Sequence, residues 1–198
     1  MAANTYLTPE ERTLLESVRV GIAGAGGLGS NCAMHLVRAG VKHLTVVDFD
    51  VVNESNLNRQ FFFRGQLGQK KVEAIKENLL RIEPDADIRT VDMRLDASSA
   101  REVFADCGIV VEAFDAVDAK VMLVSAFASS GKKLVTASGL AGWGRSNAMR
   151  VRKMGNIVAI GDGETSVGDG AAPVSPRVGI AAAMEANAVV SLLLGCEP

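Results

Sequence analysis

Apolar residues along this chain alternate between short continuous runs and stretches in which they recur every three or four positions. The continuous runs are typical of buried strands and cover residues 18–23, 43–47, 88–91, 109–112 and 134–137. Helical spacing separates the runs, and Leu28, Cys32 and Leu36 give its first example. Strands that alternate with helices predict a Rossmann-like α/β fold, a mostly parallel sheet with helices on both faces.

The helix boundaries follow from capping residues and helix breakers. A short first helix is expected from Pro9, with Thr8 as its cap, and the helix after the first strand is expected to end at Gly40. Further helices are predicted at residues 69–82, 98–105, 118–128 and 177–194.

The pattern changes after Gly139. Residues 148–151 and 156–160 resemble a hairpin that adds antiparallel strands to the edge of the sheet, and residues 161–173 form a Gly-rich crossover to the last helix. Because no repeat or linker divides the chain, a single domain over residues 1–198 is predicted.

Composition narrows the range of partners. The chain has 198 residues, 48% of them hydrophobic, which is enough for one α/β domain but not for a second, substrate-binding one. With a formal net charge of −2 and no run of Lys or Arg, neither nucleic acid nor a membrane surface is expected as a partner. Residues 1–7 lack the features of a secretory signal and no segment has the length of a membrane span, so a cytoplasmic protein is predicted.

The three cysteines carry no metal-binding spacing. Cys32, Cys107 and Cys196 form no Cys-x-x-Cys pair, so neither a disulfide framework nor zinc is expected. Cys32 and Cys107 are predicted to lie in the core, and Cys196 is the thiol expected at the surface.

A glycine turn between the first strand and the next helix is the first candidate site. Gly24, Gly26, Gly27 and Gly29 would let backbone N–H groups approach a phosphate, and Asp48, after the second strand, would accept hydrogen bonds from ribose hydroxyls. This pattern fits NAD as well as ATP, and glycines here could also serve close packing alone.

The polar stretch from residue 48 to residue 71 decides between these nucleotides. It contains Asp48-Phe49-Asp50, Ser55-Asn56-Leu57-Asn58-Arg59-Gln60 and Gly68-Gln69-Lys70-Lys71. Together with the glycine turn and a later Asp115, these segments resemble the ThiF, MoeB and HesA family of adenylyltransferases, which activate ubiquitin-like proteins. The resemblance runs from about Val18 to Leu194.

The resemblance implies a role for each matching residue. Asp48 would hold the ribose, and Asp115 would hold Mg²⁺. The residues expected along the triphosphate of ATP are Asn56, Arg59, Gln60 and Lys71. Arg59, Lys71 and Asp115 are the candidate catalytic residues, because positive charge can stabilise the developing pyrophosphate without a protein nucleophile.

The resemblance also implies a reaction and a partner. Residues 138–147 look like the compact ThiF branch of thiamine biosynthesis, whose partner is a small ubiquitin-like sulfur carrier, ThiS. The chain would adenylate the C-terminal glycine carboxylate of that carrier, release pyrophosphate and work as a homodimer. The paired cysteines with which family members bind zinc are absent, and so is the crossover-loop cysteine that some members use.

Two other functions remain open from the residues. An NAD-binding oxidoreductase satisfies the glycine pattern, although Tyr6 is the only tyrosine and precedes the first strand. A partner subunit that keeps the fold without the chemistry is the other, although Arg59, Lys71 and Asp115 would serve no purpose in such a scaffold.

Overall fold

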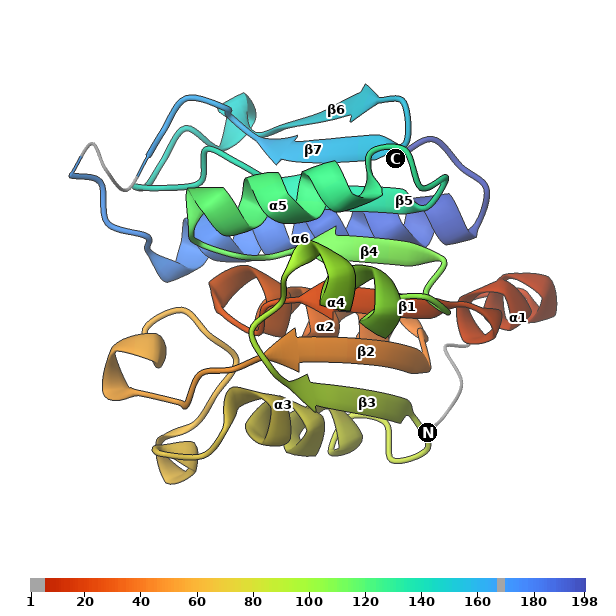
Figure 1. The fold of residues 1–198 in the computed structure, drawn as a ribbon, viewed down its shortest axis with the longest axis horizontal. Helices are drawn as coiled ribbons and strands as arrows, with labels where there is room; N and C mark the ends of the chain where they lie inside the picture. The colour runs from red at the N-terminus through yellow and green to blue at the C-terminus, as the bar shows by residue number, and fades with distance from the viewer. Residues whose placement is uncertain (1–5, 167–169) are drawn as a thin grey trace.

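The computed structural model describes residues 6–166 and 170–198 and contains one seven-stranded sheet (Figure 1). The sheet order is β3-β2-β1-β4-β5-β7-β6, and all neighbouring strands are parallel except β7 and β6. The strands are β1 (Arg19–Ala23), β2 (His43–Asp48), β3 (Asp87–Asp92), β4 (Ile109–Glu112), β5 (Lys133–Ala137), β6 (Arg150–Met154) and β7 (Ile157–Gly161).

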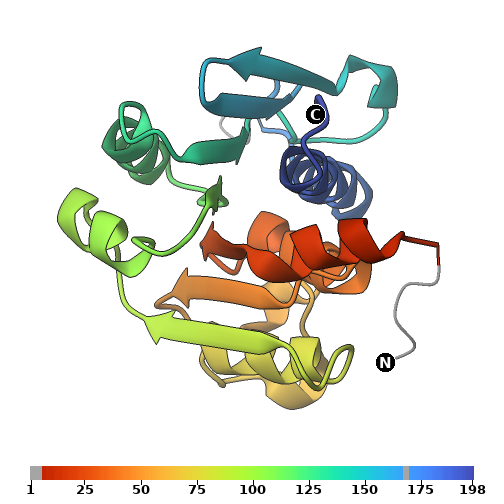
Figure 2. The same cartoon turned by 90° about the vertical axis from the view of Figure 1, so that its right-hand side faces the viewer.

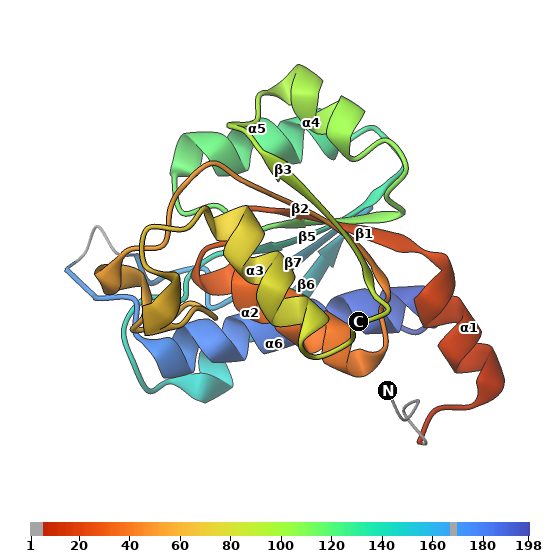
Figure 3. The same ribbon diagram turned by 90° about the horizontal axis from the view of Figure 1, so that it is seen from below.

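Helices cover both faces of this sheet, as predicted. They are α1 (Pro9–Ser17), α2 (Gly27–Ala39), α3 (Lys71–Leu80), α4 (Ala97–Val103), α5 (Val117–Phe127) and α6 (Ser175–Leu193). Figure 3 shows α4 and α5 on one face and α2, α3 and α6 on the other. Figure 2 shows α6 between α2 and the β6–β7 hairpin.

Two apolar cores follow from this layering, one on each face of the sheet. Val20 and Ile22 of β1 point into the core beneath α2 and α6, whereas Ala23 belongs to the core beneath α4 and α5. Gly21 also faces α4, where a Cβ atom would collide with the ring of Phe104. The strand therefore alternates between two buried faces, which explains its continuous apolar run.

The start of α1 and the end of α2 match the capping signals in the sequence. Thr8 and Glu11 form a capping box at the start of α1. Gly40 has a φ of 110° and donates its N–H to the last turn of α2. By contrast, α3 begins at Lys71 rather than near residue 69, because Lys70 pairs with Val51 in a short antiparallel bridge and keeps the chain extended.

The hairpin adds an antiparallel pair at the edge of the sheet, as predicted, but the bounds of its strands differ from the prediction. Its strands lie at Arg150–Met154 and Ile157–Gly161, and only β6 is antiparallel, because β7 runs parallel beside β5. A 3₁₀ turn takes up residues Ser146–Ala148 and delays the first strand. Every residue of β6 is exposed, so no buried face marked its position in the sequence.

Cysteine burial and helix length complete the comparison with the sequence predictions. Cys32 and Cys107 are buried and Cys196 is exposed, as expected. Burial raises the pKa of Cys32 well above its usual value and that of Cys107 to about 11, so both remain protonated at neutral pH. Within residues 6–166 and 170–198, no helix combines the length and apolar character needed to cross a membrane.

Candidate functional site

The glycine turn lies where β1 passes into α2, at the carboxyl edge of the sheet. Gly24 has a φ of 101°, and a Cβ atom there would lie 2.9 Å from the carbonyl oxygen of Ala113. A Cβ on Gly29 would overlap the carbonyl oxygen of Gly24. Gly24 and Gly29 are therefore required by close packing of the backbone, which is the alternative explanation that the sequence left open for the glycine motif.

Gly26 immediately precedes α2, and Gly27 is the first residue of the helix, where a Cβ atom would lie 3.0 Å from Val178 Cγ1. A Cβ on Gly26 would have 3.9 Å to its nearest neighbour, Gln60 Nε2, and no side chain caps this end of the helix. The first N–H groups of α2 are thus left for another acceptor. Uncapped N–H groups at a helix N-terminus favour an anion such as phosphate.

Asp48 ties this turn to the end of β2. Its Oδ2 atom accepts the backbone N–H of Ala25 at 2.6 Å, and its Oδ1 atom accepts that of Asp50 at 2.8 Å. Each carboxylate oxygen keeps a second lone pair that can accept from a hydroxyl. Asp48 therefore holds the two strand ends together and retains the capacity to bind a ribose.

The polar loop lies against the first turn of α2 through Arg59 and Gln60. The aliphatic part of Arg59 comes within 3.5 Å of the Cβ position above Gly27, and Gln60 lies beside Gly26. Gln60 is buried, and its Oε1 atom has no hydrogen-bond partner within the described part of the chain. The structure thus places Arg59 and Gln60, two of the residues expected along the triphosphate, beside the first turn of α2.

Asn31 fixes this arrangement and was not singled out in the sequence. Its Nδ2 atom donates to the carbonyl oxygens of Gly27, at 2.6 Å, and Arg59, at 2.8 Å. The side chain of Asn56 accepts the N–H of Asn53 at 3.0 Å and so shapes the 3₁₀ turn at Glu54–Asn56. The position of Asn31 on α2, one helical turn after Gly27, is the only sequence signal of its role.

Lys71 lies at the start of α3 and is almost completely buried. Its Nζ atom donates to Asp50 Oδ2 at 2.8 Å, and its backbone N–H donates to the carbonyl oxygen of Asp50. Asp50 therefore positions the ammonium group and fixes the turn. A phosphate would share the charge of Lys71 with this carboxylate.

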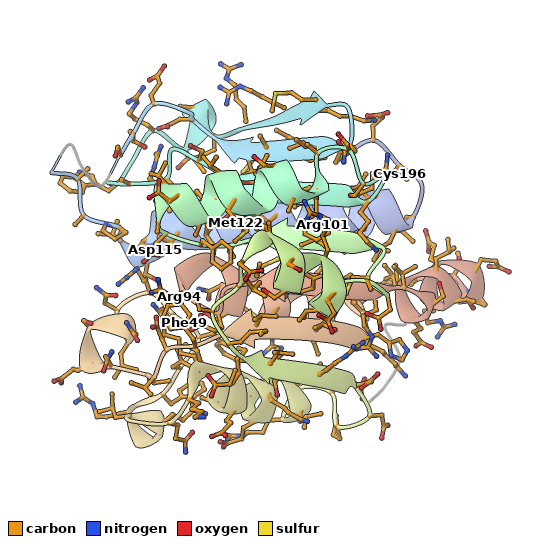
Figure 4. The ribbon with its side chains drawn as sticks, in the orientation of Figure 1. Phe49, Arg94, Arg101, Asp115, Met122 and Cys196 are labelled. Carbon is orange, nitrogen blue, oxygen red and sulfur yellow. The ribbon has the colours of Figure 1, made fainter. Side chains whose placement is uncertain are left out.

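Asp115 is exposed in the loop that follows β4, at the same edge of the sheet (Figure 4). Among the described residues, no three His, Cys, Asp or Glu side chains gather closely enough to hold a metal ion. Mg²⁺ is commonly bound by one or two carboxylates together with substrate phosphates. A single carboxylate facing a triphosphate fits such a site.

A buried polar network supports the loop that carries Asp115. Glu112 is fully buried and accepts hydrogen bonds from the N–H of Phe114 at 2.8 Å, Thr136 Oγ1 at 2.6 Å and Lys120 Nζ at 3.0 Å. Lys120 also donates to the carbonyl oxygen of Ala137. A charged residue inside an apolar strand was the signal in the sequence that this position is special.

Glu185 of α6 lies close to this network and has a raised pKa. It is fully buried, and neither carboxylate oxygen has a hydrogen-bond partner among the described residues. Burial raises its pKa well above the usual 4.5, the negative charge of Glu112 raises it further, and Lys120 partly offsets this. Glu185 is therefore protonated under conditions in which an exposed glutamate is charged.

We expect Glu185→Gln to change how stability depends on pH. Between the pKa of the unfolded chain and the raised pKa of the folded one, only the folded state keeps the proton, so stability falls as pH rises, by up to about 1.4 kcal/mol per pH unit. In the Glu185→Gln variant, this fall in stability with rising pH is absent. Urea unfolding from pH 4 to pH 8 should show that, above about pH 4.5, the free energy of unfolding of the variant increases relative to that of the unaltered protein. Parallel profiles would contradict the assignment, and Glu102→Gln at an exposed position is the control.

These features together define a Rossmann-like α/β protein whose glycine turn, loop cations and strand-end carboxylates meet at one edge of the sheet. Residues 3–198 match the model of the ThiF family. The chain belongs to that family, which confirms the resemblance seen in the sequence.

Named relatives share large parts of the chain. It is 31% identical over 189 residues to the adenylyltransferase and sulfurtransferase UBA4 of Yarrowia lipolytica, covering 91% of this chain and 47% of that protein. It is 37% identical over 115 residues to the molybdopterin-synthase adenylyltransferase of Salmonella typhimurium, covering 58% of this chain and 46% of that protein. The chain thus spans less than half the length of these two relatives.

Solved structures establish the fold. The E. coli tRNA N6-threonylcarbamoyladenosine dehydratase TcdA, solved with AMP, superposes with a TM-score of 0.86 at 19% identity, covering 94% of this chain and 90% of that one. E. coli MccB, solved with ATP, gives a TM-score of 0.77 at 20% identity, covering 95% of this chain and 59% of that one.

Proposed function

We propose that this chain binds ATP and uses it to adenylate the C-terminal glycine carboxylate of a small ubiquitin-like sulfur carrier, acting as one domain over residues 1–198. The observation that carries the proposal is the meeting of Arg59 and Gln60 with the uncapped first turn of α2. Lys71 and Asp115 lie at the same carboxyl edge of the sheet. Relatives named as adenylyltransferases, and related folds solved with AMP or ATP, support this choice of nucleotide.

The chemistry follows from the charges in the site. A carboxylate oxygen of the carrier attacks the α-phosphorus of ATP, a new P–O bond forms, and the bond to the departing pyrophosphate breaks. Negative charge grows on the phosphate oxygens during this step, where Arg59, Lys71 and the N–H groups of α2 stabilise it. Asp115 would hold Mg²⁺, which supplies further positive charge to the phosphates.

We propose a ThiS-like carrier and a place in thiamine thiazole biosynthesis as the narrower role. The support is the stretch 138–147, which resembles the compact ThiF branch. The relatives are named for molybdopterin synthase and for sulfur transfer and not for thiamine, so their names do not support one carrier over another. The identity of the carrier is therefore the point that an experiment must decide.

The direct test incubates the chain with ATP, Mg²⁺ and purified carriers and measures the intact mass of each carrier. The expected result is an added adenylate on the ThiS-like carrier, which disappears when the last glycine of the carrier is deleted. An adenylate on a molybdopterin-type carrier alone would overturn the thiamine role and keep the reaction. No adenylate on any glycine-ending carrier would overturn the reaction itself.

We also propose that the chain forms a homodimer. Most apolar residues of α6 pack internally, but Ile180 and Met184 are only partly buried and lie against the core. A second copy would cover these side chains. Sedimentation at micromolar concentration is expected to give a dimer, and a monomer throughout that range would contradict the proposal.

A further inference from the structure

One charged pair joins the carboxyl ends of two neighbouring strands, β4 and β5. Glu112, the last residue of β4, is fully buried, and its Oε2 atom accepts from Lys120 Nζ at 3.0 Å and from Thr136 Oγ1 at 2.6 Å. Lys120 lies near the start of α5 and also donates to the carbonyl oxygen of Ala137, the last residue of β5, at 3.1 Å. We call Glu112 and Lys120 the strand-end pair.

The strand-end pair lies directly beneath the loop that carries Asp115. Glu112 Oε1 accepts the backbone N–H of Phe114 at 2.8 Å, one residue before Asp115. Among the described residues, the side chain of Asp115 itself forms no hydrogen bond or ion pair. The position of this carboxylate is therefore set through the backbone of its loop, which Glu112 holds and Lys120 ties to β5.

Stability alone does not account for a charged pair at this place. Removing two charges from water costs free energy that their attraction only partly offsets, and apolar side chains of similar volume often close a core equally well. What the pair adds is a set of directed hydrogen bonds to α5, to β5 and to the loop after β4. Directed bonds of this kind fix the orientation of a loop, which apolar packing does less strictly.

We propose that Lys120, acting through Glu112, is a positioning residue for Asp115 and so sets how strongly the site holds Mg²⁺. This inference rests on the proposed function, in which Asp115 holds the metal beside the phosphates of ATP. Groups that orient a metal-binding carboxylate typically contribute about 10- to 100-fold to metal affinity or to activity. The effect of Lys120 is therefore expected on ATP binding with Mg²⁺ and not on ATP binding without the metal.

The test measures the ATP affinity of the full chain by calorimetry, once with Mg²⁺ and once with EDTA. In Lys120→Met, the affinity is expected to fall about tenfold with Mg²⁺ and to stay unchanged with EDTA. Lys120→Arg should keep most of the affinity, because it keeps the charge and the hydrogen-bond donors. Hydrogen exchange of the chain without nucleotide is the second readout, in which the N–H of Phe114 should exchange faster in Lys120→Met.

Lys132→Met is the matched control. Lys132 donates to the carbonyl oxygens of Ala105 and Cys107, near the amino ends of β4 and β5, so its loss removes similar hydrogen bonds far from the site. Because Lys120→Met leaves a buried charge without its partner, a double variant, Glu112→Gln with Lys120→Met, is measured beside it. The double variant is expected to fold and to lose ATP affinity with Mg²⁺, because the tie through Lys120 to β5 is gone.

The possible failures can be told apart. ATP affinity with Mg²⁺ that is unchanged in the folded single and double variants would overturn the inference alone. A loss of the same size in Lys132→Met, or in Lys120→Met with EDTA, would also overturn it, because the effect would then be a general loss of stability. An unaltered chain that binds no ATP under either condition would overturn the proposed function together with this inference.

Discussion

Replacing Arg59 with alanine is expected to slow acyl-adenylate formation by roughly a hundred- to a thousandfold, which corresponds to about 3 to 4 kcal/mol of transition-state stabilisation. The aliphatic part of Arg59 lies against the first turn of α2, and its guanidinium would stabilise the negative charge that develops as pyrophosphate departs. Its hydrogen bonds within the chain, to the Ser55 carbonyl and to Asn58, are local to the loop. The variant should therefore stay folded and lose less in ATP binding than in rate.

Arg64→Ala provides a matched control for Arg59→Ala. Arg64 belongs to the same polar loop, but its side chain is 77% exposed and paired with Glu54. Single-turnover rates of adenylate formation on the carrier should separate the two variants by at least tenfold. A folded Arg59→Ala protein with a near-normal rate would remove Arg59 from the catalytic residues.

Asp115→Asn is expected to lower the same rate about a hundredfold at low Mg²⁺ and to recover part of it as Mg²⁺ is raised. An amide oxygen is a weaker ligand than a carboxylate, so a higher metal concentration compensates for weaker binding. The same titration should leave Arg59→Ala unchanged, because a cation held at Asp115 does not replace the guanidinium.

The control for this titration is Asp118→Asn, at an exposed position one turn further along the chain. It removes the same charge close to the site without the predicted contact to the metal. Equal losses in the two asparagine variants would indicate a general effect of charge. A loss in Asp115→Asn that no Mg²⁺ concentration relieves would indicate that Asp115 has a role other than holding the metal.

The sequence predicted those parts of the fold and site that depend on residues close together in the chain. The apolar runs predicted the strands that they cover, and Gly40 predicted the end of α2. The glycine turn and residues 48–71 identified the segments that meet at the carboxyl edge of the sheet. Each of these signals comes from backbone geometry or from side chains of one local segment.

Contacts between segments distant in the chain were not predictable in the same way. The pairing of Lys71 with Asp50 and the hydrogen bonds of Asn31 to the loop depend on how the loop folds back onto α2 and α3. The sequence around Glu185 predicts an apolar helix, but only the packing of α6 shows that the carboxyl group of Glu185 is buried. The bounds of β6 were misplaced because an exposed edge strand has no buried face.

Pyrophosphate exchange into ATP is the measurement that distinguishes an adenylyltransferase from an NAD-binding protein or a scaffold with the same fold. With labelled pyrophosphate, ATP and Mg²⁺, exchange is expected only when a carrier ending in glycine is present, because the carrier carboxylate accepts the adenylate. Omitting the carrier or deleting its last glycine should abolish the exchange. Exchange that is unchanged without a carrier, or absent with every glycine-ending carrier supplied, would contradict adenylation of a carrier by this chain.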